Sequence, residues 1–358
     1  MFTYIVQRVL LMFPTLLGIT MLVFFVMAFS PGGIGGPLME RRGAGMSSVD
    51  AARVREYYNK RYGIDKPKLV QYGRWLNLIS PVGFSLKNDG TLGEFGFKEP
   101  SLGESLEQHR PVADVIAEAL PITLLLNIVS IPLIYGTGII SGILAARRRG
   151  GFYDTVSGIV QLGTWSIPTI WAGVMLIGLL ANREYLKWFP TSGLHDPAAL
   201  LMAFLPHFTP HGWERGWLLD TIWHLVLPII CLSYGGSAFL TKLTRGSVLE
   251  NLGADYVRTA RAKGVDERVV LYHHVFRNSL LALITVAASI LPALLGGSVV
   301  VEWIFSVPGM GRLGVESVQS RDREVVLAVT LIGGLIGLVS QILRDLLYAV
   351  ADPRVRYD

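Results

Sequence analysis

The chain has 358 residues, of which 51% are hydrophobic and only 16% are Asp, Glu, Lys or Arg, and its mean hydropathy is +0.46. An average soluble domain carries about 25% charged residues, so this composition excludes a disordered chain and argues against an ordinary soluble enzyme. The net charge of +5 does not indicate nucleic acid, because the charged residues lie between long apolar runs. The composition therefore predicts a membrane protein.

Six stretches without a charged side chain are long enough to cross ~30 Å of hydrocarbon as helices. In chain order they are 9–29, 119–146, 155–182, 221–241, 278–301 and 325–343. The first stretch could instead be a cleaved signal peptide, since Arg8 precedes it and small residues lie near its end. Its apolar run is longer than the about 7–15 residues of a signal peptide, which favours a retained membrane anchor.

The distribution of Lys and Arg predicts the orientation of these spans. With the N-terminus inside, the short inside segments hold 14 Lys and Arg in 67 residues, and the short outside segments hold 6 in 60 residues. Positive charge is enriched on the cytoplasmic side of membrane proteins. We therefore expect both termini in the cytoplasm, with Arg147, Arg148 and Arg149 ending the second span on that side.

The two outside segments are expected to differ in size. The segment 30–118 contains helical patterns over 54–62 and 67–78 and is large enough for a small extracytoplasmic subdomain, which must gain stability by docking on the bundle or on a partner. In the second segment, 183–219, the apolar run 198–205 is too short to span and predicts an interfacial or re-entrant helix. Its histidines lack metal-ligand spacing and are interpreted as solvated loop residues.

The inside segment 242–277 predicts two short helices joined at a glycine. Residues 249–263 have a helical composition rich in Ala and basic residues, and Gly264 can end this helix in the left-handed conformation. Asp266 can cap a second helix that runs to Arg277. A basic helix pair of this kind can dock into a groove of a partner, although a solvated basic loop that only sets the topology is the alternative interpretation.

This inside segment resembles the cytoplasmic EAA loop of dipeptide/oligopeptide/nickel-type ABC importer permeases. The resemblance is carried by Tyr-Val-Arg-Thr-Ala-Arg-Ala-Lys-Gly at 256–264 and His-Val-Phe-Arg-Asn at 274–278. It continues over nearly the whole chain, with similar motifs at 62–67, 120–123, 189–193, 305–312 and 352–356. Arg258 stands where the broader consensus has Glu, and Phe276-Arg277 stand where it has Leu-Pro, which is common in the peptide branch.

The resemblance implies an all-α polytopic membrane protein with the type I importer permease fold. It divides the chain into an N-terminal transmembrane helix (1–29), an extracytoplasmic subdomain (30–118), a five-helix permease core with a cytoplasmic coupling loop (119–350, loop 242–277) and a cytoplasmic tail (351–358). The implied partners are a second homologous permease, two ATP-binding subunits, an extracytoplasmic solute-binding protein and the lipid bilayer of the inner membrane, with no nucleic acid. ATP and Mg would be bound by the partner subunits, and no cofactor or metal is expected in this chain.

Two sets of site residues follow, and neither is catalytic. The resemblance assigns coupling to the ATPase to Tyr256, Arg258, Thr259, Ala260, Arg261, Ala262, Lys263 and Gly264. Polar side chains within the spans are expected to face protein or water, and they are candidates for the translocation pathway as well as for helix-to-helix hydrogen bonds. They are Asn127, Gln161, His224 and Gln341.

Energy for transport is expected to come from a separate subunit. The sequence contains no Gly-x-x-x-x-Gly-Lys-Ser/Thr motif, and the six spans contain no Asp or Glu that could couple protons or sodium. The motifs His-Glu-x-x-His and Gly-x-Ser-x-Gly of hydrolases are also absent from the sequence, which argues against a membrane enzyme. A secondary carrier or a channel that acts without an ATPase is the alternative function.

Overall fold

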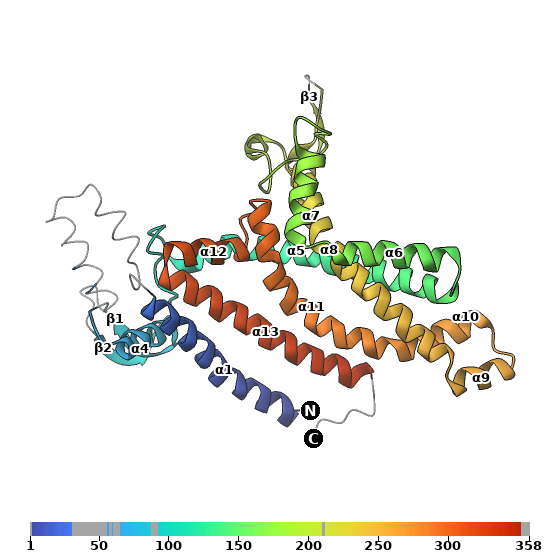
Figure 1. The fold of residues 1–358 in the computed structure, drawn as a ribbon. Coiled ribbons are helices and arrows are strands. Elements are labelled where there is room, and N and C mark those ends of the chain that lie inside the picture. The colour runs from blue at the N-terminus through green and yellow to red at the C-terminus, as the bar shows by residue number, and fades with distance from the viewer. Residues whose placement is uncertain are drawn as a thin grey trace. The chain divides into compact units, whose positions relative to one another are not determined.

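The computed structural model describes residues 2–30, 56, 59, 65–86, 92–209 and 212–351, and most of them are helical (Figure 1). The chain divides into two compact units. The first contains Met1–Tyr4, Pro121–Arg312 and Val339–Asp358, and the second contains Ile5–Leu120 and Leu313–Leu338. Several helices contribute residues to both units.

The first unit is built on long helices from the predicted spans. Its elements are α5 (Val112–Arg147), α6 (Phe152–Ser166), α7 (Thr169–Leu176), the π-helical η1 (Ile177–Ala181), α8 (Gly216–Leu252), α9 (Asp255–Ala262), α10 (Glu267–Val269), the π-helical η3 (Val270–Phe276) and α11 (Arg277–Ile304). Leu126 of α5, Leu227 and Cys231 of α8 and Phe305 after α11 form one buried apolar cluster. This cluster joins α5, α8 and α11 around a common core.

Five helices in the described residues are long and apolar enough to cross a membrane, and the number is six if the bent pair of α6 with α7 and η1 is counted as one span. The span predicted over 155–182 is not one continuous helix, because α6 and α7 meet at an angle of 96°. Pro168 has no backbone N–H and disfavours the helical conformation of the residue before it. Ile167 accordingly has an extended ψ of 120°, and its carbonyl accepts a hydrogen bond of 2.7 Å from the Tyr234 hydroxyl.

The outside segment before α8 is less helical than expected. The helix expected over 198–205 is only a 3₁₀ helix, η2 (Pro197–Leu201), which is capped by the Asp196 side chain. A short hairpin of β3 (His207–Thr209) and β4 (Gly212–Glu214) follows it. Pro197 lies at the first position of this helix, where a missing N–H costs nothing, and Pro206 disfavours a helical conformation only at the residue before it.

The second unit includes the segment 30–118, which lies between the first two predicted spans. Its elements are α1 (Phe2–Phe29), α4 (Lys68–Ile79), β1 (Val82–Leu86), β2 (Leu92–Phe97), α12 (Met310–Ser320) and the first part of α13 (Arg323–Ala351). Tyr72 and Trp75 of α4 are buried against Phe24 of α1 and Leu327 of α13. This packing supplies the apolar burial that the segment 30–118 was expected to need.

One part of this unit was not predicted from the sequence, and two predicted segments lie mostly outside the described residues. The antiparallel hairpin β1–β2 was not predicted, and it is held to α4 because the Asn77 side chain bonds both the N–H and the carbonyl of Phe84. The helix expected over 54–62 falls mostly outside the described residues, as does the tail 352–358.

Before α13, the buried Asp322 carboxylate accepts hydrogen bonds from the Ser105 hydroxyl (2.6 Å) and the Glu107 N–H (3.2 Å). Burial raises the pKa of Asp322, and these bonds oppose that shift.

Candidate functional site

The segment predicted to contact an ATPase, residues 256–264 on α9, rests on an apolar base made by other helices of the first unit. Val257 and Ala260 of α9 are buried, and they pack in one cluster with Ile143 of α5, Val248 of α8 and Val275 of η3. These two α9 residues are three apart, so they lie on the same face of the helix. The cluster therefore fixes one face of α9 on three helices and leaves the opposite face exposed.

The glycine at the end of α9 has the conformation that the sequence predicts. Gly264 has a φ of +76°, which L side chains rarely adopt. Its N–H bonds the Arg261 carbonyl at 2.9 Å, and the Val265 N–H bonds the Ala260 carbonyl at 3.2 Å. This pair of bonds is the Schellman arrangement, in which the residue after the glycine also packs on the helix.

The start of the coupling helix corrects our prediction of a helix over 249–263. The chain breaks helix at Gly253 and Ala254, and Ala254 is extended with a ψ of 150°, so α8 ends at Leu252 and α9 begins at Asp255. At the other end, Asp266 accepts a hydrogen bond of 2.8 Å from the Arg268 N–H, as a capping residue should. The helical backbone then continues through α10 and η3 into α11.

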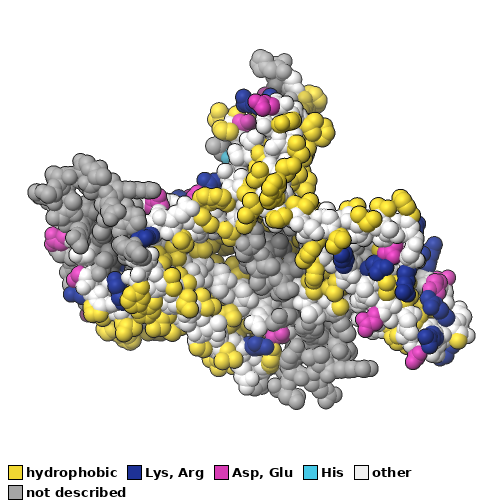
Figure 2. Space-filling model, in the orientation of Figure 1, with side chains coloured by type: hydrophobic (Ala, Val, Ile, Leu, Met, Phe, Trp, Pro, Cys, Tyr) yellow, Lys and Arg dark blue, Asp and Glu magenta, His cyan; other side chains and the backbone are white. Residues whose placement is uncertain are grey.

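The exposed face of α9 is polar and basic. Tyr256, Thr259, Ala262 and Lys263 are exposed, and the Arg258 side chain is 75% exposed, whereas Ala260 is buried. Arg261 donates two hydrogen bonds to Glu267 across the glycine turn, at 3.1 and 2.5 Å, and these bonds raise the pKa of Arg261. Lys and Arg side chains gather over α9, α10 and the α5–α6 turn in Figure 2. This face can dock with an acidic or polar surface.

The four polar residues proposed for the pathway lie on four different helices, and no hydrogen bond joins any two of them within the described chain. The Asn127 amide donates to the Thr123 carbonyl at 2.6 Å, and His224 Nδ1 lies 2.8 Å from the Asp220 carbonyl, so both are held by their own helix. Gln161 is half-buried and 3.4 Å from the Ser141 hydroxyl, and Gln341 is half-buried on α13.

A second polar cluster holds the start of the motif at 305–312. The buried Glu302 carboxylate accepts the Thr123 hydroxyl at 2.7 Å and the Arg312 N–H at 3.0 Å. The same Thr123 oxygen accepts the Met310 N–H at 2.8 Å. Glu302 and Thr123 therefore satisfy backbone donors in the first turn of α12, where a helix leaves its N–H groups without helical partners.

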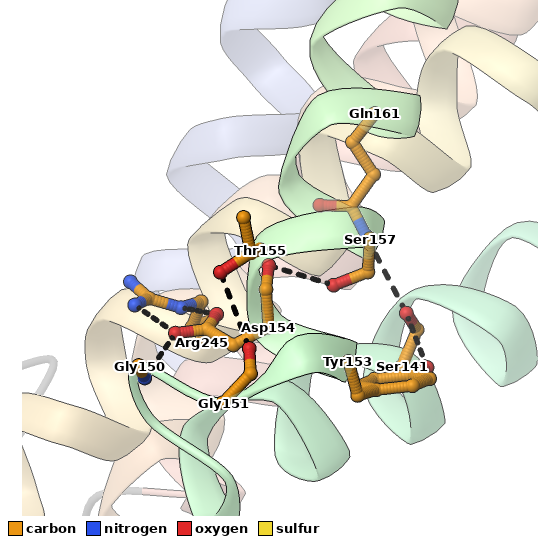
Figure 3. A network of polar contacts seen from close by, with 9 residues as sticks. All are labelled: Ser141, Gly150, Gly151, Tyr153, Asp154, Thr155, Ser157, Gln161 and Arg245. Atoms are coloured by element: carbon orange, nitrogen blue, oxygen red, sulfur yellow. Dashed lines mark hydrogen bonds and ion pairs between the residues drawn. The ribbon is translucent and has the colours of Figure 1, made fainter.

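Sequence reasoning missed two residue pairs that the structure brings together. Thr123 and Glu302 lie 179 residues apart, so no local pattern connects them. The available signal was that Glu302 is a carboxylate directly after an apolar run. Asp154 and Arg245 form a bidentate ion pair of 2.6 and 2.8 Å between α6 and α8, and Asp154 also accepts the Gly150 N–H (Figure 3). Asp154 and Arg245 lie just outside the predicted spans, where Arg245 was counted only for the topology and Asp154 was given no role.

Comparisons with known proteins cover the whole length of the chain. Residues 138–357 match the family model described as binding-protein-dependent transport system inner membrane component, and residues 1–127 match the corresponding N-terminal model. The oligopeptide transport system permease protein AppB of Bacillus subtilis (strain 168) is 36% identical over 358 residues and covers 100% of both chains. The peptidoglycan transport system permease protein YejB of Agrobacterium fabrum (strain C58) is 32% identical over 387 residues, covering 99% of this chain and 98% of that protein.

Among solved structures, the MetNI methionine ABC transporter in an inward-facing conformation is 18% identical to this chain, with a TM-score of 0.47, over 67% of this chain and 97% of that chain. The two family matches, the full-length relatives and the bundle of apolar helices agree. This chain belongs to the family of binding-protein-dependent transport system inner membrane components and is a permease subunit of an ABC importer.

Proposed function

We propose that this chain forms half of an ATP-driven pathway that imports peptides, or a related small solute, across the inner membrane, with both of its termini in the cytoplasm. The observation that carries this proposal is the exposed basic face of α9, held on a base of α5, α8 and η3. Two of the full-length relatives are named as oligopeptide and peptide transport permeases, and these names support peptides as the solute.

The proposed partners are a second, homologous permease, two ATP-binding subunits that hold ATP and Mg, and an extracytoplasmic solute-binding protein. We assign the exposed residues of α9, from Tyr256 to Gly264, to contact with an ATP-binding subunit. A push on α9 reaches Ile143 of α5, Val248 of α8 and Val275 of η3 through direct apolar contacts. Closure of the ATPase is thereby converted into a rigid-body movement of the spans.

Reconstitution tests the function and its solute together. The chain, its second permease, the ATP-binding subunits and the binding protein are placed in liposomes, and ATP hydrolysis is measured with a dipeptide, an oligopeptide or Ni²⁺. We expect hydrolysis to rise only when the binding protein and a peptide are both present. Uptake by this chain alone, without ATP, would favour a carrier or a channel instead.

The glycine after α9 tests the coupling role. Gly264→Ala places a side chain in a left-handed residue, at a cost of roughly 1–2 kcal/mol, and should disturb the angle between α9 and α10. Gly253→Ala is the matched control, because Gly253 has a right-handed conformation and its added Cβ would meet the Glu250 carbonyl at an ordinary 3.5 Å. We expect Gly264→Ala to lower transport while membrane insertion is unchanged, and Gly253→Ala to transport normally. Full transport by both variants would contradict the role of this turn.

A further inference from the structure

A cleft of about 480 Å³ lies between α6 and α8 at the end of these helices that carries Asp154 and Arg245. Besides this ion pair, its lining includes Lys242 of α8 and Ile159 and Leu162 of α6. None of these residues belongs to the coupling face of α9. The lining also includes Gln161, one of the four candidate pathway residues, but the exposed face of α9 does not account for the cleft.

The polar end of the cleft carries an excess of positive charge. The Asp154 carboxylate is fully engaged, because it accepts two hydrogen bonds from Arg245 and one from the Gly150 N–H (Figure 3). Lys242 is exposed and forms no ion pair with any residue in the described part of the chain. Arg149 is a further cation near Asp154. An anion entering the cleft meets one ammonium group that no protein carboxylate neutralises.

The other end of the cleft is apolar and faces outward. Ile159 is 67% exposed and Leu162 is 56% exposed, and Trp165 continues this exposed face one turn further along α6. At 1.5 Å per residue, Asp154 and Leu162 are about 12 Å apart along the helix. A Cβ added at Gly158, which lies between them in the lining, would meet no atom within 4 Å. The cleft thus offers a cation at one end and an open apolar wall beyond it.

We propose that this cleft binds an anionic phospholipid, with the head-group phosphate at Lys242 and an acyl chain along Ile159 and Leu162. Free phosphate shares the head-group chemistry but has no part that would use the apolar wall. One basic residue near the membrane surface strengthens the binding of an anionic lipid by about 1 kcal/mol, which is about a fivefold change in affinity. With the orientation given under the proposed function, the lipid lies in the cytoplasmic leaflet. This assignment to a leaflet rests on the proposed function.

Native mass spectrometry of the full-length chain tests the proposal without requiring transport. The purified protein is incubated with equal amounts of phosphatidylglycerol and phosphatidylcholine, with or without millimolar inorganic phosphate, and the retained lipid is counted. We expect preferential retention of phosphatidylglycerol, a loss of about fivefold in Lys242→Gln, and no competition by phosphate. Lys242→Arg should retain the lipid, and Lys187→Gln, which removes an exposed cation outside the cleft, should behave as wild type.

A second pair of variants tests occupancy of the cleft itself. Gly158→Leu should fill the space and abolish the preference for phosphatidylglycerol. Gly163→Leu on the same helix should keep this preference, and a Cβ at Gly163, like one at Gly158, meets no atom within 4 Å. Equal retention of the two lipids by wild type, or unchanged retention in both Lys242→Gln and Gly158→Leu, would overturn the proposal. Displacement by inorganic phosphate would assign a free-anion site instead. Loss of a co-purifying subunit from Gly158→Leu, with lipid retention unchanged, would assign a protein contact. Counting the retained lipid requires no solute and no ATP. A failure of the lipid proposal is therefore distinguishable from a failure of the proposed import function, which the reconstitution experiment tests.

Discussion

Glu302 is a carboxylate at the end of an apolar helix, and its neighbours explain why it is there. Its two oxygens accept the Thr123 hydroxyl and the Arg312 N–H, while Thr123 in turn accepts the Met310 N–H. A buried acceptor with such partners is stable only while the donors remain. The two side chains therefore act as a single unit that fixes how the chain leaves α11 and enters α12.

Removing either member of this unit should destabilise the protein. Thr123→Val keeps the shape of the side chain but leaves the Met310 N–H without its acceptor, at a cost of about 1–3 kcal/mol. Glu302→Gln should cost a similar amount, because one acceptor oxygen becomes a donor. Thr123→Ser retains the hydroxyl and serves as the control. Thermal unfolding in detergent measures the effect, and equal midpoints for Thr123→Val and Thr123→Ser would contradict it.

The glycines of α12 should differ in their tolerance of a methyl group. A Cβ at Gly311 would lie 2.5 Å from the Val299 Cα, whereas a Cβ at Gly314 would lie 3.6 Å from a Val329 methyl group. Overpacking typically costs about 1–3 kcal/mol, and Gly→Ala in an open helical position gains up to about 1 kcal/mol. We expect Gly311→Ala to lower the unfolding midpoint and Gly314→Ala to leave it unchanged or raise it. A variant pair with equal midpoints would show that α12 can move away from Val299.

For single residues, the sequence could predict the structural role where that role depends on the local backbone. Gly264 and Asp266 were identified because a helix end has its own sequence pattern, and the structure confirms the left-handed glycine and the cap. Thr123 with Glu302, and Asp154 with Arg245, depend on contacts between distant segments. No local pattern records which distant partner a polar side chain will meet.

Among the elements, α9 shows a clear division between a buried face and an exposed one. Val257 and Ala260 point into the apolar cluster, while Arg258 and Lys263 are exposed. The helix has only eight residues, which is too short to be stable alone in water. Its conformation therefore depends on the helices beneath it, and its exposed residues are available for a partner.

Charge reversal on the exposed face of α9 should weaken coupling without unfolding the protein. Arg258→Glu changes a side chain that is 75% exposed and whose contact with Asp255 is a weak 3.5 Å pair, so stability should change by less than about 1 kcal/mol. We expect at least a tenfold loss of stimulated ATP hydrolysis in the reconstituted importer. Arg183→Glu, an exposed cation of the other loop, is the control. Normal hydrolysis in Arg258→Glu would place the ATPase contact elsewhere.

The apolar runs predicted most elements because length and hydropathy are properties of single segments. They could not predict how α8 is separated from α9, since Ala254 is a good helix former and yet is extended directly before α9. The hairpin β1–β2 was missed for a related reason. Its strands are short and contain several glycines, and they are held by Asn77 of α4 in addition to their own pairing.

For the whole molecule, the arrangement of charge supports a definite orientation that one labelling experiment can test. Cys231 is the only cysteine of the sequence and is buried, so Cys231→Ala supplies a background without reactive thiols. In that background, Phe208→Cys lies in the exposed β3–β4 hairpin and Arg148→Cys in the exposed α5–α6 turn. We expect a membrane-impermeant maleimide to label Phe208→Cys in intact cells and Arg148→Cys only after permeabilisation. The reverse pattern would overturn the orientation.

The bend between α6 and α7 has a consequence for the thickness of the surrounding bilayer. The 15 residues of α6 extend about 22 Å, which is less than the ~30 Å of a hydrocarbon core. The second arm leaves at 96°, so it adds little to the reach along the axis of α6. The pair therefore creates a hydrophobic mismatch that the five longer candidate spans do not share. Lipid must thin beside this pair, or another protein must cover it, at a cost of fractions of a kcal/mol per ångström.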